Sequence, residues 1–203
     1  GLIEINKESQ STRELYGIDK EPTADFGRRC LMARRMIERG VRFVTVDVRE
    51  PLTDKTPGGF NMNWDHHDYI YNKGSCGTIR NGAGGEGRYG IAHWVMMGST
   101  DQAFAALVAD LEDRGLLADT LVAFVSEFGR TPRLNRFKGR DHWTNAYSIA
   151  LAGGGVPGGQ VIGSSDNEGG YVTNRPTRPD DYAATVYEKL GLDRTKPVYT
   201  PSN

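Results

Sequence analysis

The sequence has few cysteines, no long apolar run and almost no excess of charge of either sign. Its two cysteines, Cys30 and Cys76, are too few for a disulfide framework and do not identify a redox compartment. No apolar stretch approaches the roughly 18 residues of a membrane-spanning helix, so no transmembrane segment is expected. The 25 basic and 26 acidic residues nearly balance, which argues against a general nucleic-acid-binding protein.

The length of 203 residues fits one domain or a large part of one, and the 26 glycines indicate many loops. Apolar periodicity predicts alternating helices and strands, with helices at about 24–39, 99–114 and 179–190 and strands at 41–48, 120–126 and 147–152. This order predicts an α/β fold in which helices flank a mostly parallel sheet. Ligands of such sheets bind in loops at the carboxyl ends of the strands.

Three polar segments, residues 64–67, 126–133 and 139–143, follow predicted strands and contain three of the four histidines, His66, His67 and His142. Imidazole and carboxylate ligands together suit a divalent cation such as zinc or manganese. We therefore predict a metal site that draws on these segments. Two structural alternatives remain open: His142 as a hydrogen-bonded loop residue, and Glu127 in a salt bridge with a nearby arginine.

The second segment leads into a basic cluster of Arg130, Arg133, Arg136, Lys138 and Arg140, and no acidic residue lies between Arg130 and Arg140. Arginine forks match phosphate and sulfate oxygens, so Arg130, Arg133 and Arg140 are candidate anion-binding residues. A solvated loop is the alternative interpretation. Ser126 lacks the Gly-x-Ser-x-Gly setting of a nucleophile elbow, and no catalytic nucleophile is assigned.

Together these segments resemble the sulfatase-like family catalogued as domain of unknown function 1501, a bacterial branch of the alkaline phosphatase superfamily. The most specific matches are Trp-Asp-His-His at 64–67, Glu-Phe-Gly-Arg-Thr-Pro at 127–132 and Gly-Arg-Asp-His at 139–142. The resemblance covers nearly all of 1–203 apart from an insertion at about 72–97. It implies an alkaline-phosphatase-like layered fold, incomplete at the N-terminus, with this chain as the C-terminal half of one domain.

The same resemblance implies a set of metal ligands. Asp65, His67 and His142 would hold one divalent ion, which the sequence does not identify among zinc, manganese, calcium and magnesium. Glu127 would help to hold a second ion, at a place where relatives usually carry an Asp followed by a His. Here Phe128 follows, so the second site has one ligand fewer.

Two further residues would support these ligands. His66 would be a ligand or would contact one, and Asp141 would orient His142, because metal-bound histidines usually need a hydrogen-bond partner. The family's N-terminal segment, which would supply a nucleophile, is not recognisable here.

The function that the resemblance implies is metal-dependent hydrolysis of phosphate or sulfate esters, with an anionic small molecule or a glycan ester as substrate. A metal-bound water or the absent N-terminal part would supply the nucleophile. One alternative is a non-catalytic, metal-stabilised structural or binding module. Another is a fragment that acts beside a second chain carrying the N-terminal half. A periplasmic or secreted location is implied by the family alone, since the chain shows no export signal.

Overall fold

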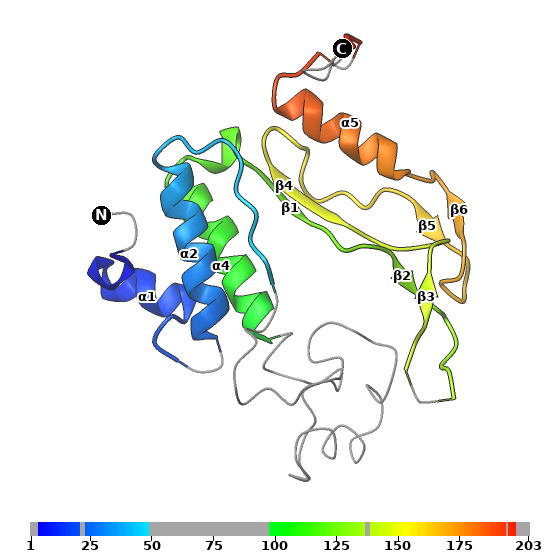
Figure 1. The fold of residues 1–203 in the computed structure, drawn as a ribbon, viewed down its shortest axis with the longest axis horizontal. Coiled ribbons are helices and arrows are strands. Elements are labelled where there is room, and N and C mark those ends of the chain that lie inside the picture. The colour runs from blue at the N-terminus through cyan, green and yellow to red at the C-terminus, as the bar shows by residue number, and fades with distance from the viewer. Residues whose placement is uncertain (1–3, 21–22, 49–97, 137–138, 194, 198–203) are drawn as a thin grey trace, which may run out of the picture.

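The computed structural model describes residues 4–20, 23–48, 98–136, 139–193 and 195–197 (Figure 1). None of the helices in these ranges is long and apolar enough to cross a membrane. The elements, in chain order, are η1 (Ile5–Lys7), α1 (Gln10–Tyr16), α2 (Ala24–Ile37), α4 (Ser99–Asp113), η3 (Leu117–Asp119), β1 (Leu121–Phe124), β2 (Gly129–Arg130), β3 (His142–Trp143), β4 (Ala150–Gly153), β5 (Ser164–Ser165), β6 (Val172–Asn174) and α5 (Pro179–Lys189).

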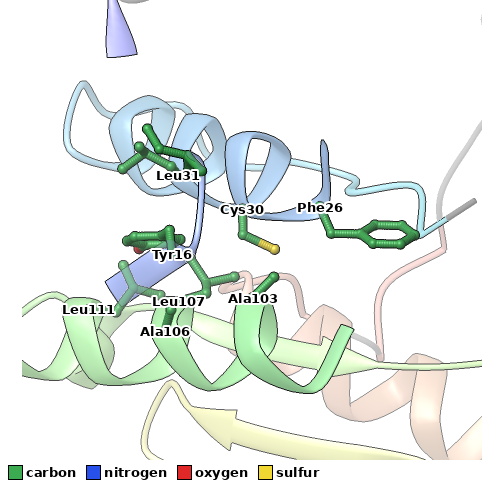
Figure 2. Close-up of a cluster of buried hydrophobic side chains, with 9 residues drawn as sticks. Tyr16, Phe26, Cys30, Leu31, Ala103, Ala106, Leu107 and Leu111 are labelled. Atoms are coloured by element: carbon green, nitrogen blue, oxygen red, sulfur yellow. The ribbon is translucent and has the colours of Figure 1, made fainter. Parts of the chain in front are cut away.

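Helices α1, α2 and α4 enclose the main hydrophobic core, shown in Figure 2. Its apolar residues recur three or four positions apart on α2 and α4, which places them on one face of each helix. Cys30 is a buried apolar packing residue of this core, and burial raises the pKa of its thiol to about 11. The buried members of the core are Tyr16, Ile18, Phe26, Cys30, Leu31, Ala103, Ala106, Leu107 and Leu111.

A buried ionic cluster lies beside this core. The guanidinium of Arg34, in α2, is only 2% exposed and contacts the carboxylates of Glu8 at 2.9 Å, Glu38 at 2.7 Å and Asp110 at 2.9 Å. The hydroxyl of Tyr16 donates a hydrogen bond to Asp110 at 3.0 Å. Residues from three separate parts of the chain therefore share one buried arginine, which fixes the packing of the helices around it.

The strands of the described residues form three separate two-stranded ladders, β1–β4, β2–β3 and β5–β6, and all three are antiparallel. In Figure 1 the β1–β4 ribbon lies between the α2–α4 pair and α5. Strands thus have helices on either side in this view. The mostly parallel sheet of the predicted layered fold stays a prediction, because these ladders are too small to test it.

Residues 41–48 were predicted to form a strand, and the structure gives them no ladder partner among the described residues. Their burial still alternates: Val44, Val46 and Val48 are half-buried, whereas Phe43 is 69% exposed. Val46 and Val48 pack against the helical core. The segment therefore keeps the two-residue period of a strand with one covered face, although none of the strands among the described residues pairs with it.

The sequence signals for helix ends were confirmed at some helices and not at others. Gly40 and Gly115 follow α2 and α4 with φ of 79° and 70°, as expected for helix-terminating glycines, and α5 begins at Pro179 as predicted. The sequence Ser-Thr-Asp-Gln at 99–102 predicts a capping box with Ser99 as the N-cap, but Ser99 is the first helical residue, Gly98 precedes it, and no side chain caps the helix. The sequence also predicts a short hairpin at about 160–163, whereas the structure places a strand pair later, at β5 and β6.

Candidate functional site

The candidate site is built on the short antiparallel pair of β2 and β3. Gly129 lies opposite Trp143, and Arg130 lies opposite His142. A further hydrogen bond, from the amide of Thr131 to the carbonyl of Asp141 at 3.0 Å, continues the pairing. Because neighbouring strand residues point to opposite faces, Arg130 and His142 share one face and Gly129 and Trp143 share the other. Two segments singled out in the sequence thus meet.

The first face carries the predicted chemistry. The rings of Phe128 and His142 are in contact, with centroids 4.3 Å apart at an angle of 54°. The carboxylate of Glu127 lies 3.6 Å from the guanidinium of Arg130, and the Glu127 side chain is 61% exposed. A carboxylate, a guanidinium and an imidazole are therefore gathered around one strand pair. The Glu127–Arg130 salt bridge, one of the alternatives left open by the sequence, is present.

The second face anchors the strand pair to the rest of the fold. The indole Nε1 of Trp143 donates a hydrogen bond to the carbonyl of Gly170 at 2.6 Å, and its ring meets that of Tyr171 edge-on at 5.5 Å. Gly129 has no room for a side chain, since a Cβ there would lie 1.9 Å from the carbonyl oxygen of Ala146. This packing holds β2 and β3 against the segment between β5 and β6.

The segment that receives Trp143 is itself fixed by one carboxylate. The side chain of Asp166 accepts hydrogen bonds from the amides of Glu168 at 3.1 Å, Gly170 at 2.7 Å and Tyr171 at 3.0 Å. A carboxylate that binds several backbone amides within one turn restrains the whole turn. The Gly170 carbonyl is therefore held in position for the Trp143 indole.

The loop between β2 and β3 is closed by side chains that sequence reasoning did not single out. The Asn135 side chain accepts from the amide of Gly139 at 3.0 Å and donates to the Asp141 carboxylate at 2.9 Å. The Thr131 hydroxyl accepts from the amide of Asp141 at 3.1 Å and donates to the carbonyl of Arg133 at 2.9 Å. The available signal was Asn135 itself, because asparagine side chains often hydrogen-bond nearby backbone groups in turns. The orientation of His142 by Asp141 stays a prediction.

The predicted anion-binding arginines differ in their surroundings. Arg140 is half-buried, and its Nη1 donates to the carbonyls of Thr131 at 2.6 Å and Pro132 at 2.5 Å. Arg130 is half-buried too, and its Nη1 lies 3.4 Å from the carbonyl of Arg140. Arg133 is exposed. The structure therefore brings the three residues into one loop but gives them unequal access to solvent.

The structure describes only some of the predicted metal ligands. Asp65, His66 and His67 lie outside the described residues, whereas His142 and Glu127 lie within them. Within the described ranges, no three His, Cys, Asp or Glu side chains come together as a group that could hold a metal ion. Convergence of Asp65, His67 and His142 on one ion stays a prediction.

Fold and site define a mixed α/β protein whose candidate site is an arginine-rich antiparallel hairpin that carries a histidine. The chain belongs to the family described as protein of unknown function (DUF1501), whose model matches residues 2–203. The match includes the insertion expected at about 72–97 and is not confined to a C-terminal half of the chain. No curated protein and no solved structure matches the chain.

Proposed function

We propose that this protein is a metal-dependent hydrolase of phosphate or sulfate esters, related to the alkaline phosphatases and sulfatases. The observation that carries the proposal is the pairing of Arg130 with His142 across β2 and β3, beside the exposed carboxylate of Glu127. Hydrolysis of such esters needs positive charge near the anionic group and ligands for a metal that activates the nucleophile. The strand pair supplies an imidazole for the second need, and the arginine-rich loop that it closes supplies the positive charge for the first.

The donor atoms fit a divalent ion. The imidazole of His142 and the carboxylate of Glu127 are both ligand types that zinc and manganese accept. In the proposal, His142 joins Asp65 and His67 at one ion, and Glu127 contributes to another. When bound, the metal would act as a Lewis acid and lower the pKa of a coordinated water. An anionic small molecule or a glycan ester is the proposed substrate.

The packing behind the site supports a binding role for its open face. Trp143 and Gly129 fix the strand pair from the opposite side, through the Gly170 carbonyl and the close approach of Ala146. Catalytic and metal-binding groups need such a rigid support, because small displacements of the reacting groups are costly. The site face itself is left with an exposed His142 and an exposed Glu127.

The test is ester hydrolysis by the full chain. After treatment with a chelator, turnover of an aryl phosphate and an aryl sulfate is measured while zinc, manganese, magnesium or calcium is added back. We expect metal-dependent turnover that is lost in His142→Ala and reduced at least about tenfold in Glu127→Gln, one tenfold step being about 1.4 kcal/mol of barrier. Glu112→Gln, an exposed glutamate on α4, is the matched control and should be unaffected.

Two results would contradict the proposal. One is turnover that is absent with every metal, and the other is turnover that survives both substitutions unchanged. A rise in melting temperature on metal addition, without hydrolysis of either ester, would instead favour the non-catalytic, metal-stabilised module.

A further inference from the structure

The three predicted anion-binding arginines, Arg130, Arg133 and Arg140, are not equivalent. The Arg140 guanidinium lies against the backbone, where it donates to the carbonyls of Thr131 and Pro132 at 2.6 and 2.5 Å. Charge-assisted bonds to two consecutive carbonyls hold the start of the loop to its end. If Arg140 broke these bonds to reach a ligand, two carbonyls would lose this donor. The role of Arg140 is therefore to stabilise the conformation of the loop.

The guanidinium of Arg130 is also engaged by groups of the protein. Its Nη1 lies 3.4 Å from the Arg140 carbonyl, and its Nη2 lies 3.6 Å from Glu127. The side chain is 19% exposed. An anion that approached Arg130 would have to compete with the carboxylate of Glu127, which repels it.

Arg133 combines a fixed backbone with a free side chain. Its carbonyl accepts a hydrogen bond from the Thr131 hydroxyl at 2.9 Å, and that hydroxyl also binds the Asp141 amide at 3.1 Å. The guanidinium of Arg133 is exposed and has no hydrogen bond or ion pair within the described parts of the chain. All five of its N–H donors therefore remain available to a ligand.

We propose that Arg133 is the residue of this loop that contacts the anionic group of the substrate, and that Arg130 and Arg140 are positioning residues. The inference rests on the proposed function for the identity of that group, a phosphate or sulfate ester. Because the backbone of Arg133 is held by a hydrogen bond, less conformational entropy is lost on binding. A planar guanidinium can also bind two oxygens of a tetrahedral anion at once.

The experiment measures binding of inorganic phosphate, and separately of inorganic sulfate, to the full chain by titration calorimetry at low salt. We expect Arg133→Gln to weaken binding of the preferred anion about tenfold or more and to leave the melting temperature unchanged. Arg133→Lys should restore part of the affinity, because it keeps the charge and loses the fork. Arg28→Gln, an exposed arginine on α2, is the control.

The positioning residues have a different signature. Arg140→Lys should accelerate hydrogen exchange at the amides of Thr131 and Asp141 and lower the melting temperature, whereas Arg133→Gln should change neither. Wild-type affinity for both anions in Arg133→Gln would overturn the inference, as would the absence of anion binding in the wild type. Anion binding through Arg133 without ester turnover would sink the proposed function alone, while turnover that needs His142 but not Arg133 would sink this inference alone.

Discussion

The guanidinium of Arg34 lies 2.9 Å from the carboxylate of Asp110, and this contact joins α2 to α4 where both side chains are buried. Asp110 also binds Arg114 at 2.7 Å, and Arg114 reaches Glu38 at 2.8 Å. The three carboxylates and the arginines around them therefore neutralise one another inside the helical layer. Removing one partner would leave a buried charge without a counter-charge, and this strongly destabilises the folded state.

Arg34→Met should destabilise the fold by about 3–5 kcal/mol, because Glu8, Glu38 and Asp110 would lose their shared cation. Urea denaturation at neutral pH measures the change in the free energy of unfolding. Arg28→Met, at an exposed position of the same helix, should change it by less than about 0.5 kcal/mol. Equal effects of the two substitutions would show that the buried cluster does not hold the helices together.

The acid side of the stability profile should depend on Glu8. Burial acts to raise the pKa of its carboxyl, but hydrogen bonds and charge interactions with Arg34 and Arg35 outweigh burial, and the pKa lies below its ordinary value of 4.5. The folded state therefore binds this proton less tightly than the unfolded chain. The resulting stabilisation is complete above the unfolded pKa and is lost as the pH falls through the lower, folded pKa.

We accordingly expect Glu8→Gln to cost about 2 kcal/mol at pH 7 and progressively less as the pH falls below about 4.5. Urea denaturation of both proteins between pH 7 and pH 3 measures the difference. Glu112→Gln should show no such convergence with pH, since that carboxylate is exposed on α4. A gap between wild type and Glu8→Gln that stays constant down to pH 3 would argue against the assignment.

Gly129→Ala tests the support of the site. The added Cβ would lie 1.9 Å from the Ala146 carbonyl oxygen and 3.0 Å from that of Trp143, both backbone atoms that cannot swing away. We expect a loss of about 1–3 kcal/mol or more in the free energy of unfolding, together with altered Trp143 fluorescence. Gly158→Ala, where a Cβ meets nothing within 4 Å, should stay within about 0.5 kcal/mol of the wild type. Tolerance of Ala at both positions would contradict the packing described here.

Phe43→Lys tests the uncovered side of residues 41–48. Phe43 is 69% exposed and Val41 is 42% exposed, on a segment with strand-like alternation and no ladder partner in the described parts of the chain. Exposed apolar strands promote self-association. We expect the substitution to lower the apparent mass in static light scattering at high protein concentration, with little change in melting temperature. Unchanged scattering would show that this surface does not drive association.

Local sequence signals were enough to predict α2, α4 and α5. The apolar periodicity of α2, α4 and α5 depends on contacts within one or two turns, and the glycines after α2 and α4 can adopt positive φ without strain. Cys30 lies on the same apolar face of α2 as Phe26 and is buried with it in the core. These features are properties of short stretches of chain and need no distant partner.

Two of the predicted strands, 120–126 and 147–152, coincide with β1 and most of β4, but their pairing was not predicted. Residues 120–126 were predicted as a strand, and β1 occupies Leu121–Phe124, yet its partner in the structure is β4 and the ladder is antiparallel. A two-residue alternation is the same whichever neighbour pairs with the strand and in whichever direction. Residues 41–48 show the limit of the signal, because the alternation is present but no described strand forms a ladder with them.

The amino-acid sequence by itself determined the helices, the core face of α2, the family and the chemical character of the loop between β2 and β3, because each of these depends on residue type and short spacing. Only the tertiary structure decided that Arg130 lies opposite His142, that Trp143 is held by the Gly170 carbonyl, and that Arg140 is occupied while Arg133 is free. The physical reason is that register and hydrogen-bond partners are set by contacts between residues distant in the chain. Residue composition is the same whether or not those contacts form.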